Sequence, residues 1–136
     1  MNNIISELNE KQIRQLHELY LNEWWTKERT LKDTIKCVRG SQVCIGIVDE
    51  NNNLIGFVRV ITDFIFKALV FDLIINKNKR NQGIGKKLMK EMLHHKKLSE
   101  VKHFELYCLP ELKSLYKQFG FSDDIKGVQL LRRKNA

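Results

Sequence analysis

The pattern of apolar and polar positions predicts two helices in the first 40 residues. Apolar side chains recur at helical spacing over positions 10 to 20, directly after Asn9, which suits an N-cap. A second helix is predicted to begin after Thr30 and to end at Gly40. In both cases a polar residue stands three positions after the cap, where it can complete a capping box.

From position 43 onward, short apolar runs separated by turn residues replace the helical pattern. The runs at 43–49 and 54–63 flank the turn sequence "ENNN" and predict a β-hairpin, and the nearly continuous apolar run at 68–75 predicts a strand buried on both faces. The remaining predicted elements are a helix from Gly85 to about Lys97, a strand at 101–109, a short helix from Pro110 to Gly120 and a last strand at 128–132. This order indicates a mixed α/β fold around one sheet, in a single domain over residues 1–136.

Composition narrows the class of protein without identifying a function. The chain carries 24 Lys and Arg against 16 Asp and Glu, a net charge of +8 that attracts anions such as phosphates. The longest apolar run, at 64–75, is interrupted by charges and is too short to cross a bilayer, and the N-terminus lacks the pattern of a secretory signal. A cytoplasmic location with no membrane partner is therefore expected. The three cysteines are scattered, which predicts neither a disulfide framework nor a metal site.

The stretch "KRNQGIGKKL" at 79–88 joins the buried strand to the next helix and holds two glycines among basic residues. The first amides of a helix have no intrahelical acceptor and lie at the positive end of its dipole, so such a loop can cradle a phosphate. A dinucleotide-binding fingerprint fails at Leu88, and a Walker phosphate loop fails at Asn81 and Lys87. Taken alone, an isolated Gly-x-Gly more often only turns the chain.

Two motifs together resemble the GNAT acetyltransferase superfamily. "DLIINKNKRNQGIGKKLM" resembles its motif A, in which Arg/Gln-x-x-Gly-x-Gly/Ala follows a buried strand and opens a helix, with Arg80, Gly83 and Gly85 in the three positions. "LYKQFGF", beginning at Leu115, resembles the second motif, Tyr-x-x-x-Gly-Phe. The likeness covers positions 43–132 in element order. It implies a GNAT-like domain whose mixed central sheet is flanked by about four helices, with splayed strands at an acyl-CoA site.

The resemblance implies acetyl-CoA as the co-substrate. In this family the backbone amides of the glycine loop hold the pyrophosphate, the arginine lies near the phosphates, and the pantetheine arm hydrogen-bonds to the buried strand where it splays from its neighbour. Carried onto this sequence, the implied binding residues are Leu73, Ile75, Arg80, Asn81, Gln82, Gly83, Ile84, Gly85 and Lys86.

The implied chemistry is direct attack of a neutral amine on the thioester in a ternary complex, which depends mainly on proximity. A backbone N–H near Ile75 would stabilise the oxyanion, and Tyr116 stands where the family places the acid that protonates the CoA thiolate. The alternative for Tyr116 is that it only belongs to the apolar stripe of its short helix. Asp72, Glu23 and His17 are candidate bases for the amine, although a simply hydrogen-bonded Asp72 is the favoured interpretation.

The acceptor is not specified by these motifs and is expected to be a small-molecule amine or a protein amine. An acidic groove built from Glu18, Glu23, Glu28 and Asp63 would favour polyamines or aminoglycosides. The segment between the first two helices commonly lines the acceptor groove in this family, so of the two tryptophans at positions 24 and 25 one is expected in the groove and the other in the core.

Two other functions compete with the enzyme, and the family favours a homodimer. A GNAT-like domain can bind acyl-CoA without transferring the acyl group. A pI near 9.5 with a basic tail is also the footprint of a nucleic-acid-binding module, but no helix-turn-helix, zinc or RNA-recognition pattern accompanies it, so nucleic acid is not the expected partner.

Overall fold

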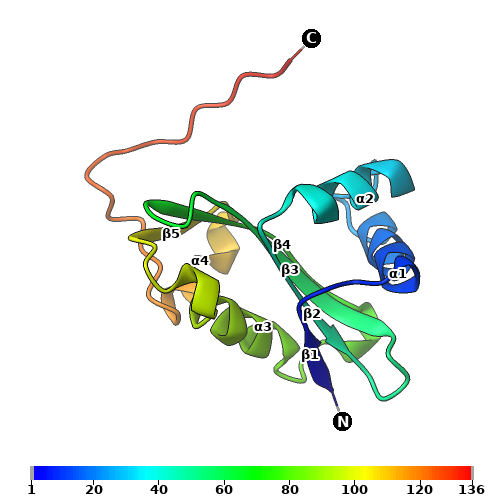
Figure 1. Ribbon diagram of the computed structural model, residues 1–136. Helices are drawn as coiled ribbons and strands as arrows, with labels where there is room; N and C mark the ends of the chain where they lie inside the picture. The colour runs from blue at the N-terminus through cyan, green and yellow to red at the C-terminus, as the bar shows by residue number, and fades with distance from the viewer. Residues whose placement is uncertain (1, 136) are drawn as a thin grey trace.

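The computed structural model describes residues 2–135 and has one five-stranded sheet, shown in Figure 1. The strands lie in the order of the chain, and neighbours are antiparallel except for the parallel pair β4 and β5. Their bounds are β1 Asn3–Ile5, β2 Val43–Val48, β3 Leu54–Thr62, β4 Lys67–Ile75 and β5 His103–Leu106. The mixed α/β fold expected from the sequence is confirmed.

Helices cover both faces of the sheet (Figure 1). On one face lie α1 (Glu10–Leu21) and α2 (Leu31–Gly40), and on the other lie α3 (Ile84–Leu93) and α4 (Lys113–Lys117). Short 3-10 turns at Lys77–Lys79, Lys96–Leu98 and Pro110–Leu112 complete the list of elements. None of the helices within residues 2–135 is long and apolar enough to cross a membrane.

The buried apolar residues divide into two cores, one on each face of the sheet. The larger core joins α3 to β2, β3 and β4, whereas the smaller one joins α1 to the opposite face of the same strands. The residues contributed by the helices are Ile84, Leu88, Met89 and Met92 to the larger core and Leu16, Leu19 and Tyr20 to the smaller one. These are the positions that recur at helical spacing in the sequence.

Both predicted capping boxes are present. Asn9 caps α1 and exchanges hydrogen bonds with Gln12, and Thr30 caps α2 and exchanges them with Asp33. Each box satisfies amides at the start of the helix, which explains why two short helices begin where the sequence predicts. Helix α3 begins as expected but ends at Leu93, earlier than predicted.

Two strands differ from expectation at the termini. The predicted strand at 128–132 is wrong: this segment has no regular structure and extends away from the sheet (Figure 1), with Leu131 89% exposed. Local β-propensity is not enough there, because the segment covers no apolar surface of the sheet. Conversely, the sequence pattern missed β1, whose three residues pair with Gly46, Ile47 and Val48 of β2.

Strand β4 is irregular at its middle. The register between β3 and β4 shifts there, and Asp72 has a φ of +58°. Val70 and Leu73, three positions apart, both pack on the core beneath α3, whereas Phe71 and Asp72 both contact Arg59 on the opposite face. A bulge in β4 therefore turns two adjacent side chains to the face that α1 and α2 cover.

Candidate functional site

The loop between β4 and α3 ends in backbone conformations that leave the first helix amides free. Asn81 and Gly83 have φ values of +64° and +78°, and Gly83 is the N-cap of α3. The first hydrogen bond of the helix runs from Lys87 N–H to the Gly83 carbonyl. The amides of Ile84 and Gly85, like that of the residue after them, therefore have no helical acceptor and lie at the positive end of the dipole.

The two glycines of this loop have different reasons to be there. Gly83 lies in the left-handed region of backbone conformation, which residues other than glycine, asparagine and aspartate rarely adopt. Gly85 is helical, and a Cβ added to it would meet no atom within 4 Å. Packing within the chain thus does not require glycine at position 85, which suits a position that a ligand approaches closely.

Strand β4 has an open edge next to this loop. Pairing with β5 runs only from Lys67 to Val70, whereas β4 continues to Ile75 in register with β3 alone. Asn76 N–H donates to the Ile55 carbonyl of β3, so the polar groups of Ile75, one residue earlier, face away from β3. The same alternation turns the backbone of Leu73 to the open edge, which leaves N–H and C=O groups for an added extended ligand.

The loop is linked to the segment after α1 by an ion pair between Arg80 and Glu23. Beside this pair is a cavity of about 280 Å³ at the end of β4. Its lining residues are Leu19, Asn22, Glu23, Ile75, Asn76, Lys77 and Asn78. In this structure Arg80 is thus held toward α1. The Glu23 carboxylate is paired with the Arg80 guanidinium group and is not free.

Tyr116 lies on α4 and packs on the edge of the larger core. Its ring contacts that of Phe121 edge-on, with centroids 6.1 Å apart. Burial, with a smaller contribution from the Cys108 thiol, raises the pKa of Tyr116 above its usual value of 10.0. The phenol therefore keeps its proton at neutral pH, which is the state a proton donor needs.

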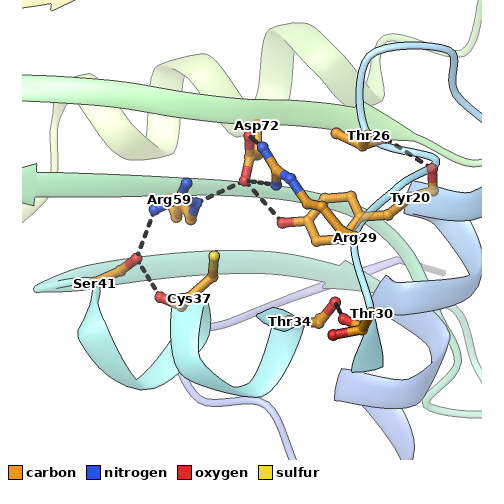
Figure 2. A network of polar contacts seen from close by, with 9 residues as sticks. All are labelled: Tyr20, Thr26, Arg29, Thr30, Thr34, Cys37, Ser41, Arg59 and Asp72. Carbon is orange, nitrogen blue, oxygen red and sulfur yellow. Dashed lines mark hydrogen bonds and ion pairs between the residues drawn. The ribbon is translucent and has the colours of Figure 1, made fainter. Parts of the chain in front are cut away.

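The most extensive polar network surrounds Asp72, as Figure 2 shows. The side chain is 3% exposed, and its Oδ2 accepts hydrogen bonds from Tyr20 Oη at 2.9 Å and from Arg59 Nε at 2.6 Å. Arg29 adds two more, from Nη1 to Oδ2 at 2.6 Å and from Nη2 to Oδ1 at 3.1 Å. The guanidinium group of Arg29 also stacks over the Tyr20 ring, 4.6 Å from its centroid.

These bonds decide the charge state of Asp72. Burial disfavours its ionised form, but the hydrogen bonds from Arg29 and Arg59 outweigh burial and hold the pKa of Asp72 below its usual 3.8. The carboxylate is therefore a weak base with its oxygens already occupied, and the favoured interpretation of a hydrogen-bonded Asp72 is confirmed. His17, another candidate base, has its Nε2 3.0 Å from the Arg29 carbonyl oxygen.

The segment after α1 corrects the expectation for the two tryptophans. Trp24 and Trp25 are 68% and 40% exposed, so the expectation that one of them lies in the core is wrong. The buried residue of the segment is Thr26, whose hydroxyl donates to the Tyr20 carbonyl (Figure 2). Of the four carboxylates that an acidic groove would use, Glu18 and Glu28 are exposed, Glu23 pairs with Arg80, and Asp63 accepts backbone amides within its own turn.

Sequence reasoning missed Arg29 and Arg59. They come from the segment before α2 and from β3, and neither lies in a recognisable motif. The one signal for Arg59 was its place as a charged residue inside the apolar run "LIGFVRVIT" of β3. Such a charge needs a buried partner, and Asp72 in the next strand was the available one.

Comparison with known proteins identifies the family of the chain. The model of a family described as "Acetyltransferase (GNAT) domain" matches residues 40–123. A relative from Pyropia yezoensis, named uncharacterized N-acetyltransferase ycf52, is 29% identical over 118 residues, which are 85% of this chain and 67% of the relative. The chain thus spans about two thirds of the length of that relative.

Solved structures agree on the fold. A protein from Xanthomonas campestris pv. campestris assigned to the GNAT acetyltransferase family aligns with a TM-score of 0.83 at 22% identity, over 98% of this chain and 94% of that one. Glucosamine-6-phosphate N-acetyltransferase from Arabidopsis thaliana aligns with a TM-score of 0.77 at 17% identity, over 99% of both chains. At these identities the likeness concerns the fold alone.

Proposed function

Because the chain belongs to the GNAT acetyltransferase family, we propose that it transfers an acetyl group from acetyl-CoA to a primary amine by direct attack in a ternary complex. The observation that carries the proposal is the open edge of β4 beside the free amides of α3. This arrangement suits an elongated ligand that has phosphates at one end and peptide-like groups along its arm. The family makes the chain an N-acetyltransferase. The proposal adds the co-substrate, the roles of individual residues and the order of events.

The proposed donor site combines two kinds of backbone contact. The amides from Asn81 to Lys86 bind the pyrophosphate, with Gln82, Gly83, Ile84 and Gly85 between them, while Leu73 and Ile75 bind the pantetheine arm. Arg80 adds charge near the phosphates once it leaves Glu23. An outward backbone N–H of this edge then lies where it can stabilise the oxyanion that forms during attack.

Proton transfer to the leaving thiolate is assigned to Tyr116. Its raised pKa keeps the phenol protonated, and its position on α4 puts it on the α3 side of the sheet, where Leu73 and Ile75 also pack. The amine must reach the site unprotonated, and we assign no base to it, because Asp72 is ionised and fully bonded. The neutral fraction of the amine then sets the rate at low pH.

Binding of CoA is the first test. A ligand that binds only the folded state raises the melting temperature, so CoA should stabilise the protein in a concentration-dependent manner. Desulfo-CoA should do the same, because the proposed contacts do not involve the thiol. A salt-sensitive shift with an oligonucleotide and none with CoA would instead support the nucleic-acid-binding alternative.

Transfer is tested by Tyr116→Phe. We expect kcat for amine acetylation, followed as free CoA release, to fall about 100-fold or more, with the CoA-induced thermal shift unchanged. Tyr107→Phe is the matched control, because it removes the hydroxyl of an exposed phenol. If wild-type protein binds CoA and acetylates no amine in a broad library, the non-catalytic alternative holds. Equal turnover in Tyr116→Phe and wild type removes the assignment of Tyr116.

A further inference from the structure

The cluster around Asp72 holds more positive than negative charge. Arg29 and Arg59 both bond to Asp72, which is the only carboxylate that either guanidinium contacts within residues 2–135. The pKa of Asp72 is lowered and those of both arginines are raised, so all three are charged at neutral pH.

Two other titratable groups of the cluster, Tyr20 and Cys44, stay neutral. Burial, with the neighbouring Asp72 carboxylate, raises the pKa of Tyr20 far above its usual value. Burial also raises the pKa of Cys44 to about 11. The bonded groups of the cluster therefore keep an excess of one positive charge, while Asp33, on α2, attracts Arg29 electrostatically without bonding to it.

Part of this charge is accessible. The Arg29 side chain is 27% exposed, and neither its Nε nor Nη2 of Arg59 has a hydrogen-bond partner within residues 2–135. No side-chain nitrogen or oxygen of the described residues is both sealed from solvent and unpartnered, so these donors reach solvent. The remaining contact of Arg59, from Nη1 to Ser41 Oγ at 3.4 Å, is long and replaceable.

The cluster also lies at the end of the open edge of β4 that is farther from the glycine loop. The phosphate-binding loop follows Ile75, so a pantetheine arm that runs back along β4 proceeds toward Phe71 and Asp72. The bulge turns both of these side chains to the α1 and α2 face, where Arg59 stacks over the Phe71 ring with 5.0 Å to its centroid. An acceptor that attacks the far end of the arm from this face meets the two guanidinium groups first.

We infer that Arg29 and Arg59 form an anion-binding subsite, and that the acetyl acceptor is a small amine that also carries an anionic group, a carboxylate or a phosphate. The inference rests on the proposed transferase function and names its substrate class. The anionic group bonds to the free guanidinium donors, which bind carboxylate and phosphate in a fixed geometry. The same charge repels a second ammonium group, so polyamines are excluded as good substrates.

The test compares acceptors in matched pairs that differ only in the anion. Amino acids are paired with their amides, and aminoalkyl phosphates with the corresponding amino alcohols. Wild-type protein should prefer one anionic series by about tenfold or more in kcat/KM, since a hydrogen bond to a charged group contributes that much. The series that is preferred tells whether the group is a carboxylate or a phosphate.

Arg29→Gln should abolish this preference by lowering kcat/KM for the anionic member about tenfold while sparing the neutral member. Arg39→Gln, an exposed arginine on α2, is the charge-matched control and should keep the preference. Arg29→Lys keeps the charge but not the planar guanidinium group, so its preference for the anionic acceptor should lie between those of Arg29→Gln and Arg39→Gln. An equal loss on both members of each pair in Arg29→Gln would show a purely structural role and overturn the inference, as would a wild-type preference for neutral or cationic amines.

A binding measurement separates this inference from the proposed transferase function. With saturating CoA present, inorganic phosphate or acetate should further raise the melting temperature of wild type and Arg39→Gln but not of Arg29→Gln. If CoA itself gives no shift, the proposed donor site fails. If CoA binds and the anions shift all three proteins equally, the subsite fails while the transferase proposal stands.

Discussion

The loop after β4 begins only a few residues after Asp72, yet the loop and the cluster around Asp72 differ in the polar groups that they present. The loop offers backbone amides that have no partner among the residues that the structure describes, and it needs few particular side chains to do so. The cluster offers side chains from four segments, and most of their polar atoms are already bonded to one another (Figure 2). Under the proposed function, the donor is bound by backbone geometry, whereas the acceptor side depends on side chains that each member of the family can vary.

The comparison predicts that changes in the cluster act mainly on stability and changes in the loop mainly on acetyl-CoA binding. The two sets of contacts share no hydrogen-bond partner, so their effects should be close to additive.

The largest effect is expected for Asp72→Ala. It leaves two partly buried guanidinium groups without their carboxylate, which costs about 3–5 kcal/mol of unfolding free energy. Alanine also adopts the φ of +58° poorly. Urea unfolding measures the loss, and Asp72→Asn, which tolerates that φ, should lose less. If Asp72→Asn is folded and stable but no longer shows a thermal shift with CoA, the cluster also contributes to CoA binding and the two regions do not act separately.

Gly83→Ala should have the next largest effect. Alanine in the left-handed N-cap position costs about 1–2 kcal/mol, and relief of that strain would move the amides of the loop. Unfolding free energy and CoA affinity should therefore fall together. A variant as stable as wild type would show that the loop does not need its left-handed residue.

Gly85→Ala sharpens the comparison because its two effects have opposite signs. Alanine stabilises a helix by about 0.5–1 kcal/mol relative to glycine, and among the described residues its Cβ meets no atom within 4 Å beyond the adjacent backbone of its own helix. The melting temperature should rise while CoA affinity falls, because the methyl group occupies space that the phosphates approach. Unchanged CoA affinity would show that the ligand does not approach this residue.

The smallest effect is expected for Glu23→Gln, which cuts the ion pair between the loop after β4 and the segment after α1. Arg80 is 46% exposed, and an ion pair open to solvent at one end contributes little, so stability should change by less than about 0.5 kcal/mol. Arg80 is released, and CoA affinity should rise about twofold. Glu18→Gln is the control, since Glu18 is an exposed glutamate near the end of α1 and the change in net charge is identical. Weaker CoA binding in Glu23→Gln than in Glu18→Gln would mean that Glu23 positions Arg80 for the phosphates.

The sequence alone predicted the elements that have a regular apolar spacing, a helix cap or a characteristic turn. Helical spacing, two capping boxes and the turn between β2 and β3 located most elements, and the strand–glycine–helix order located the glycine loop between β4 and α3. Each of these signals is local, since it depends on residues within about one turn of each other.

What the sequence did not reveal depends on distant contacts. Arg29 is 43 positions from Asp72, and Tyr20 is 52 positions away, so no local pattern connects them. The same holds for β1, which is too short to be recognised without the strand beside it. The segment at 128–132 fails in the other direction, because it has the residues of a strand but pairs with neither edge strand of the sheet, β1 or β5, in this structure.

The left-handed backbone at Asp72 also limits how this position can drift during evolution. Among the amino acids reached from aspartate by a single base change, asparagine and glycine adopt such a backbone readily, and both lack the charge that Arg29 and Arg59 need. Glutamate keeps the charge but has no such tolerance. No one-base step therefore preserves both properties, and variation in this region has to begin at the arginines.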